Sequence, residues 1–218
     1  MAKIFGKYWK VFLVDGLCFT LLLSAIVVLG GTLLGALFAL CKRSKFKPLG
    51  WIVAAIVEVV RGTPALLQLY IGYFIIPMLV PALELSGFAC VTIALTINSG
   101  AYVSEIIRSG IEAVDKGQSE AARSLGLNAR TTMMSIVLPQ AVKNILPALG
   151  NEFITIIKET SLASTFYVGE LMTAYLIVKG ATFSTIPTLM IVGVIYFVVT
   201  FVLSKLMQLL ERRMKKRA

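Results

Sequence analysis

Residues 16–41 read GLCFTLLLSAIVVLGGTLLGALFALC and contain no Asp, Glu, Lys or Arg. About 20 apolar residues in a helix are enough to cross a hydrocarbon core of roughly 30 Å. The stretch is also longer than the apolar region of a secretory signal peptide, and no convincing cleavage site follows it. We therefore expect a retained transmembrane helix from about Gly16 to Cys41, and an all-α integral membrane protein built around it.

Two glycines of this stretch, Gly31 and Gly35, have the GxxxG spacing at which helices approach each other closely in lipid. Glycine is also frequent in membrane helices generally. A close helix contact and ordinary membrane glycines both remain open interpretations.

The composition supports a membrane protein. Of the 218 residues, 58% are hydrophobic and 15% are charged, and the mean hydropathy is +0.88. The net charge of +10 would suggest nucleic acid in a soluble protein, but here Lys and Arg fall mainly between and after the apolar runs. We therefore expect lipid rather than nucleic acid as the surroundings, and we treat residues 1–218 as a single transmembrane domain.

The sequence lacks the residues that several kinds of enzyme and metal chemistry require. The sequence has no histidine and no GxxxxGK[ST] phosphate loop, and its three cysteines, Cys18, Cys41 and Cys90, form no CxxC pair. We therefore predict no catalytic residues, no metal site and no cofactor of its own. The chain cannot hydrolyse ATP by the P-loop route alone.

Four further spans are expected. Residues 49–80 would form a helix of about 48 Å, longer than a membrane is thick, and Arg61-Gly62-Thr63-Pro64 interrupts them. Proline disfavours helix in the preceding residue. We place an interfacial helix up to about Val60 and a second span from about Pro64 to Val80. The remaining spans are expected at about Phe88 to Ile111, Ile136 to Ser161 and Ile186 to Leu210, which makes about five.

The basic residues predict the orientation, because cytoplasmic loops are enriched in Lys and Arg. One orientation gives the cytoplasm the loop at residues 42–47, the stretch with Lys116, Arg123 and Arg130, and the tail at residues 211–217. The other side then receives Lys3, Lys7, Lys10 and Lys179. The N-terminal lysines argue locally against this arrangement, but the remaining loops favour it. We expect the N-terminus outside and the C-terminus in the cytoplasm.

The most polar stretch, about residues 112–135, predicts a cytoplasmic helical hairpin. Residues 118–127 read QSEAARSLGL, and IVLP follows at residues 136–139. Ser119 or Gln118 can begin the first helix, Gly126 suits the left-handed position that ends it, and Asn128 can cap the second helix. The first helix is Ala-rich and amphipathic, so it is suited to a groove on another protein.

The spacing of EAA, three residues, Gly, nine residues and I-x-L-P resembles the EAA signature of the permease subunits of bacterial ABC importers. Other segments resemble the polar amino acid branch of that family: RGTP at 61–64, NSGAY at 98–102, EIIR at 105–108, LPQA at 138–141, NEF at 151–153 and KETSL at 158–162.

The resemblance implies a permease subunit of an ATP-driven importer of polar amino acids, a multi-pass protein of the bacterial cytoplasmic (inner) membrane. It implies three protein partners: an ATPase subunit that binds ATP and Mg, a second permease subunit in a homo- or heterodimer, and an extracytoplasmic amino acid-binding protein. The coupling positions that it implies here are Glu120, Ala121, Ala122 and Gly126. A secondary transporter or channel is the rival class, although we find no clear internal repeat of the kind many such transporters show.

Ionisable residues inside the membrane need a partner or a polar path. Glu58 with Arg61, and Glu105 with Arg108, have the i, i+3 spacing of helix ion pairs. For these four we favour a structural or gating role near the cytoplasmic interface over contact with substrate.

Asn98 on the third span and Glu152 on the fourth both lie near the expected bilayer midplane. Thr155 and Glu159 share the face of Glu152 at i, i+3, i+7, and Lys158 flanks it. This set could bind an amino acid, and its two carboxylates favour a cationic one such as arginine, lysine or histidine. An internal Lys/Glu pair with helix–helix hydrogen bonds explains the same residues equally well.

Overall fold

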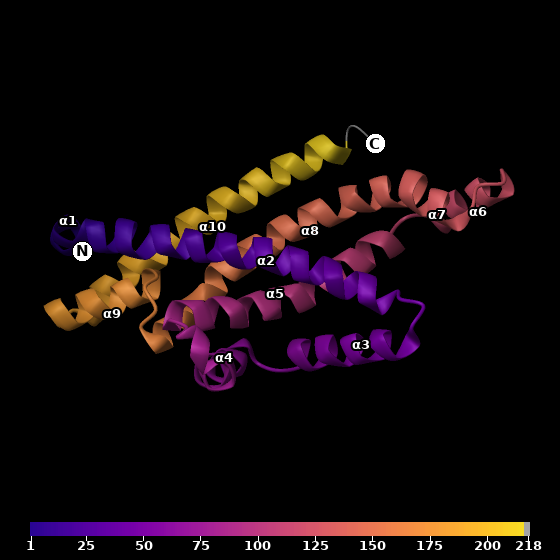
Figure 1. Ribbon diagram of the computed structural model, residues 1–218. Coiled ribbons are helices and arrows are strands. Elements are labelled where there is room, and N and C mark those ends of the chain that lie inside the picture. Colours follow the sequence, from indigo (N-terminus) through magenta and orange to yellow (C-terminus); the bar gives the residue numbers. More distant parts are fainter. Residues whose placement is uncertain (216–218) are drawn as a thin grey trace.

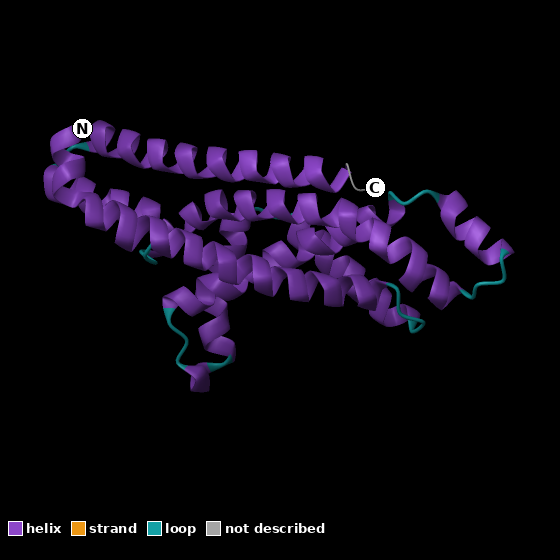
Figure 2. Ribbon diagram, turned by 90° about the horizontal axis from the view of Figure 1, so that it is seen from above, coloured by secondary structure: helices purple, strands orange, loops and turns teal. Residues whose placement is uncertain are grey.

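The computed structural model describes residues 1–215, and this part of the chain is helical without strands (Figure 1, Figure 2). Lys216 and Arg217 of the predicted basic tail lie outside the described residues. Short π- or 3₁₀-helical segments are labelled η. The elements are α1 (Ala2–Lys10), η1 (Val11–Cys18), α2 (Phe19–Lys42), α3 (Lys47–Arg61), α4 (Ala65–Leu79), η2 (Pro81–Leu83), α5 (Gly87–Glu112), α6 (Lys116–Ser124), α7 (Ala129–Thr132), η3 (Met133–Val137), α8 (Leu138–Glu159), η4 (Thr160–Phe166), α9 (Leu171–Thr182) and α10 (Thr185–Lys215).

Three helices are long and apolar enough to cross a membrane: Ala2–Lys42, Gly87–Glu112 and Thr185–Met214. Two bent helix pairs raise the number of spans to as many as five, in agreement with the expected number. The first helix is longer than predicted, because α1, η1 and α2 continue into one another over 41 residues. At 1.5 Å per residue it measures about 60 Å, so its ends extend past the hydrocarbon core.

The predicted break at Arg61-Gly62-Thr63-Pro64 is confirmed. α3 ends at Arg61, α4 begins at Ala65, and the two axes are bent by 110°. The expected roles of the two halves are wrong, however. α3 runs back beside α2, with Val53 and Val57 buried against Ala101 of α5, and α4 is the helix that turns away from the bundle direction (Figure 1).

Helices α2 and α5 form the tightest pair in the bundle, and the GxxxG glycines make this contact. A Cβ atom on Gly31 would lie 2.7 Å from Ser99 Oγ, and one on Gly35 would lie 2.7 Å from Val103. The close-contact interpretation of the motif is therefore confirmed. It places the middle of α5 directly against α2.

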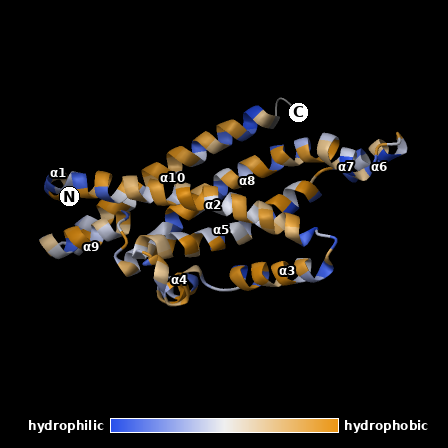
Figure 3. Ribbon diagram, viewed as in Figure 1, coloured by the Kyte–Doolittle hydropathy of each residue, from blue (hydrophilic) through white to orange (hydrophobic). Residues whose placement is uncertain are grey.

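The start of α1 and the end of α10 lie at opposite ends of the bundle, as an odd number of spans requires (Figure 1, Figure 2). The end of the bundle where α10 ends also carries the α2–α3 connection and the hairpin of α6 and α7 (Figure 1). Hydrophilic residues gather on the hairpin and the α2–α3 connection, whereas the long helices between the two ends are mainly hydrophobic (Figure 3). We call this the hairpin end of the bundle.

At the other end, Glu170 fixes the turn between α8 and α9. Its side chain is fully buried and caps α9 by accepting hydrogen bonds from the backbone N–H groups of Met172 (2.7 Å) and Thr173 (2.5 Å). It also accepts hydrogen bonds from the hydroxyls of Thr173 (3.1 Å) and Tyr196 (3.1 Å). This buried carboxylate is fully satisfied by donors of α9 and α10, so we assign it a structural role.

Candidate functional site

The predicted hairpin forms, with one correction at its start. α6 begins at Lys116 and is capped by Asp115, whose carboxylate accepts a hydrogen bond from Gly117 N–H at 2.6 Å. Ser119 and Gln118, the predicted starting residues, lie inside the helix. Asp115 was the better candidate because a carboxylate at the first turn also complements the helix dipole.

The end of α6 and the start of α7 are as predicted. Gly126 has φ +84°, in the left-handed region, and Leu127 N–H donates to Ala122 O at 3.1 Å to close the turn. Asn128 caps α7 by accepting a hydrogen bond from Thr131 N–H at 2.9 Å. The hairpin is thus a fixed structure whose sharp turn depends on glycine.

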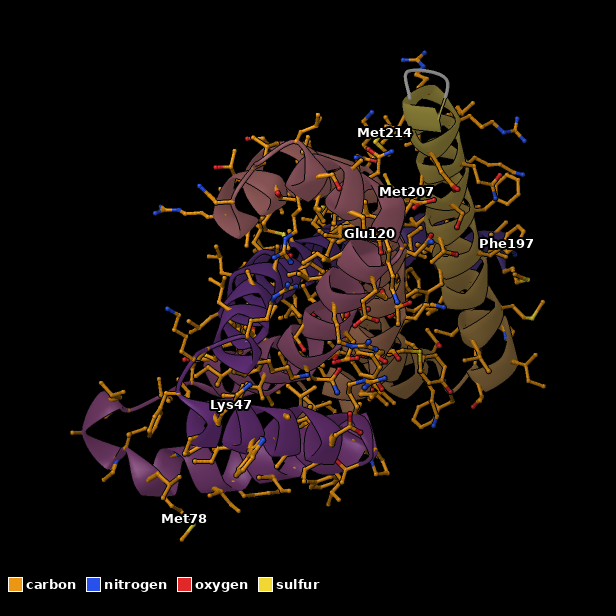
Figure 4. All side chains as sticks on the ribbon, turned by 90° about the vertical axis from the view of Figure 1, so that its right-hand side faces the viewer. Lys47, Met78, Glu120, Phe197, Met207 and Met214 are labelled. Carbon is orange, nitrogen blue, oxygen red and sulfur yellow. The ribbon has the colours of Figure 1, made fainter. Side chains whose placement is uncertain are left out.

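The four residues that we predicted to couple to an ATPase divide into an outer and an inner set. Glu120, Ala121 and Gly126 are exposed, whereas Ala122 is 5% exposed and packs inside the hairpin. Figure 4 views the hairpin end, which carries both Glu120 of α6 and Lys47, the first residue of α3. The hairpin therefore presents a short helix face with the exposed carboxylate of Glu120 to a protein that binds at this end.

A polar cluster lies halfway along α5. Ser99 Oγ donates a hydrogen bond to Glu152 Oε1 on α8 at 2.9 Å, and both residues are buried. Asn98 Nδ2 donates to Gln68 Oε1 on α4, also at 2.9 Å. The predicted pair Asn98 and Glu152 is therefore brought to the same depth from two helices, and α4 contributes a third side chain.

The orientation of the Asn98 amide follows from its neighbours. Gln68 Nε2 donates to the backbone oxygens of Val60 (2.6 Å) and Thr63 (3.1 Å), so Gln68 Oε1 must face Asn98. Asn98 then has to turn its NH₂ group toward Gln68. This leaves Asn98 Oδ1 buried and without a hydrogen-bond partner among the described residues. A buried acceptor without a donor is costly, so this oxygen is suited to a donor that arrives with a ligand.

The other predicted residues lie further along α8. Thr155 and Glu159 are half-buried on the helix that carries Glu152. Lys158 is exposed and lines a separate cavity of about 310 Å³ with Ser161, Met172 and Tyr196. Within the described part of the chain no Lys or Arg side chain forms an ion pair with Glu152 or Glu159, although the charge of Lys158 acts on the neighbouring Glu159 carboxylate at longer range.

The charged pairs predicted from i, i+3 spacing do form, near the hairpin end. Arg108 Nε lies 2.8 Å from Glu105, and Arg61 lies 3.4 Å from Glu58. Glu105 also accepts a hydrogen bond from Lys42 at 2.8 Å and lies 3.8 Å from Arg61. This carboxylate therefore joins the ends of α2, α3 and α5, which sequence spacing alone did not indicate.

Over residues 31–216 the sequence matches the family model described as binding-protein-dependent transport system inner membrane component. The chain belongs to this family. It is 41% identical over 204 residues to the arginine transport system permease protein ArtQ of Bacillus subtilis (strain 168), covering 94% of this chain and 93% of that protein. It is 39% identical to the probable glutamine ABC transporter permease protein GlnM of the same strain, covering 93% of each.

Solved structures agree with the family. The crystal structure of an amino acid ABC transporter with histidines contains a chain that is 43% identical, with a TM-score of 0.89 over 95% of each chain. A chain of the MetNI methionine ABC transporter has a TM-score of 0.76 at 16% identity, which shows the shared fold alone. The predictions of a multi-pass inner-membrane protein and of a transport permease are confirmed.

Two residues of this permease component escaped the sequence analysis, namely Gln68 and Ser99. Ser99 lies in the NSGAY segment beside Asn98, so its place next to a predicted site residue was a usable signal. Gln68 follows the helix break by a few residues and reaches Asn98 only because α4 turns by 110°. The local sequence predicts the break before α4 but not its angle.

Proposed function

We propose that this chain is the permease subunit of an ATP-driven importer of polar amino acids, and that its substrate carries a cationic side chain. The family, the named amino acid permeases among its relatives and the absence of a phosphate loop in the sequence support a separate ATPase partner that binds ATP and Mg. A second permease subunit and an extracytoplasmic binding protein complete the proposed assembly.

The buried carboxylate of Glu152 is the observation that carries the choice of substrate. A carboxylate at mid-membrane depth is costly without a compensating charge, and its hydrogen-bond partner, Ser99, is neutral. A positively charged ligand would supply the missing charge. Asn98 Oδ1, the unpartnered acceptor at the same depth, would receive a further N–H donor from an ammonium or guanidinium group.

Glu159, Thr155 and Lys158 extend the proposed path along α8. Residues seven apart on a helix are separated by about 10 Å along its axis, which is comparable to the length of an extended arginine. We assign Glu152 and Asn98 to the inner contact, Thr155 and Glu159 to the path, and Lys158 to its flank. The arrangement supports a ligand with two separated cationic groups better than a neutral one.

The hairpin supports ATPase coupling through Glu120, Ala121, Ala122 and Gly126. Its exposed face and its rigid turn suit a groove on a soluble subunit. The hairpin end carries most of the basic loops, so we propose that it faces the cytoplasm, with the N-terminus outside.

Uptake into vesicles containing the complete importer tests this function. We expect arginine, lysine or histidine to compete with one another, and neutral glutamine to compete weakly. Glu152→Gln should raise the concentration of cationic substrate needed for half-maximal uptake by about tenfold or more, because a charged contact is lost. Glu84→Gln, at an exposed residue, is the matched control. Unchanged uptake by Glu152→Gln, or preference for neutral substrates, would overturn the proposed substrate class.

A further inference from the structure

A cavity of about 710 Å³ lies at the hairpin end and takes no part in the proposed transport path. It opens between the end of α2, the second half of α5, the start of α6 and η3. Its lining falls into two groups, an apolar wall and a polar, mainly basic rim. The wall is formed by Ala39, Ile107, Ile111, Val114, Met133 and Val137.

The rim carries an excess of positive charge. Lys42, Arg43, Arg108 and Lys116 line it, against the single carboxylate of Glu112. Two of these cations are already paired: Lys42 with Glu105 at 2.8 Å, and Arg108 with both Glu105 (2.8 Å) and Glu112 (2.5 Å).

The other two cations, Arg43 and Lys116, form no ion pair among the described residues. Arg43 directly follows the last residue of α2, and Lys116 is the first residue of α6. They line the cavity from different elements, so an anion bound in it would be attracted by both charges. Both side chains are exposed and therefore free to turn toward such an anion.

The position of the cavity identifies the kind of anion. α5 is a spanning helix of 26 residues, about 39 Å long, and it ends at Glu112 on this rim, so the rim lies just past the hydrocarbon core, at the level of the membrane surface. Phosphate groups of lipids lie at this level, and basic pockets between membrane helices bind anionic headgroups. Ala39 on α2 and Ile107 and Ile111 on α5 extend the apolar wall onto the spanning helices, where acyl chains would lie. A soluble phosphate would account for the rim and leave the wall unexplained.

We propose that this cavity binds an anionic phospholipid, with its phosphodiester between Arg43 and Lys116 and its acyl chains along the apolar wall. The lipid bridges the end of α2 and the first turn of α6. It thereby adds a contact between the hairpin and the spanning bundle. Arg43 supplies a planar donor pair for the phosphate oxygens, and Lys116 a point charge.

Native mass spectrometry of the full-length chain tests the site, using protein purified in detergent with the subunits that accompany it and titrated with phosphatidylglycerol. In Arg43→Gln/Lys116→Gln the affinity for the first bound phosphatidylglycerol should fall about fivefold for each charge removed. The matched control is Lys45→Gln/Lys47→Gln, which removes the same charge from the same end of the bundle, outside the cavity lining. Phosphatidylcholine should bind the wild type and both variants equally weakly.

The outcomes separate the possible sources of the anion. Loss of phosphatidylglycerol from the cavity variant alone supports the proposal. Equal loss from both double variants would show a diffuse surface charge effect and overturn it, as would unchanged binding in the cavity variant. Displacement of the lipid by millimolar inorganic phosphate would assign the rim to a soluble anion and also overturn it. Equal thermal stability of the two double variants in detergent without added lipid verifies that the cavity variant is folded.

Discussion

Ser99 Oγ on α5 donates a hydrogen bond to Glu152 Oε1 on α8 across 2.9 Å, and the same serine lies against Gly31 of α2. One small side chain is therefore in contact with two other helices at mid-span. The position of the Glu152 carboxylate, which we propose binds the substrate, therefore depends on Ser99. The distance between α2 and α5 depends on Ser99 as well.

Replacing Ser99 by Ala should weaken substrate binding without preventing assembly. The change removes a hydrogen bond to a buried carboxylate, and such a bond contributes about 1.5–3 kcal/mol. Part of that loss is offset by rearrangement of Glu152, so we expect the substrate concentration for half-maximal uptake to rise about threefold to tenfold. Ser109→Ala on the same helix is the control, because Ser109 bonds only to Ile106 O of its own helix. An equal effect of both substitutions would argue against the specific role of Ser99.

A methyl group at Gly31 should be more damaging than its size suggests. Its Cβ would lie 2.7 Å from Ser99 Oγ and 3.3 Å from Gly100 N, so α2 and α5 must separate or Ser99 must turn away from Glu152. We expect Gly31→Ala to lower the thermal stability and also the apparent substrate affinity. In Gly193→Ala the new Cβ meets no atom within 4 Å, and alanine favours helix by about 1 kcal/mol, so that variant should be slightly more stable. Normal stability and uptake in Gly31→Ala would contradict the close-packing account.

The sequence predicted those parts of the fold that local patterns determine. The hairpin has its own turn glycine and its own cap at Asn128, so its form follows from neighbouring residues alone. The common depth of Asn98 and Glu152 followed from counting along two straight helices. The contribution of Gln68 could not be predicted, because it depends on the angle at Pro64, and a proline indicates a break without giving its direction. The ion pairs of Glu105 with Lys42 and Arg61 could not be predicted either, because they form only when α2, α3 and α5 pack together.

The hairpin turn gives a prediction that distinguishes backbone shape from side-chain size. At φ +84° a β-branched residue is strongly disfavoured, whereas asparagine tolerates the left-handed region well. We expect Gly126→Val to lose most substrate-stimulated ATPase activity of the assembled importer, and the similarly large Gly126→Asn to retain much of it. A Cβ at Gly126 meets no atom within 4 Å, so crowding inside the chain cannot account for a difference. Equal activity of the two variants would remove Gly126 from the coupling assignment.

The proposed orientation predicts that the hairpin and the α4–α5 connection, which lie on either side of α5, face different compartments. Ser124, at the end of α6, and Ala82, in η2 between α4 and α5, are both exposed. They can be replaced singly by cysteine in a chain whose own Cys18, Cys41 and Cys90 have been changed to alanine. Because the hairpin end has most of the basic loops, a membrane-impermeant maleimide should label Ser124→Cys only in inside-out vesicles.

The same reagent should label Ala82→Cys only in intact spheroplasts. The cysteine-free chain reports background labelling, and detergent-permeabilised membranes establish that both cysteines are reactive. Exchange of the two patterns would reverse the proposed orientation while leaving five spans in place. Labelling of both positions from one side would instead require an even number of crossings between them, and because α5 is the one long helix between Ala82 and Ser124, α5 would not cross as proposed.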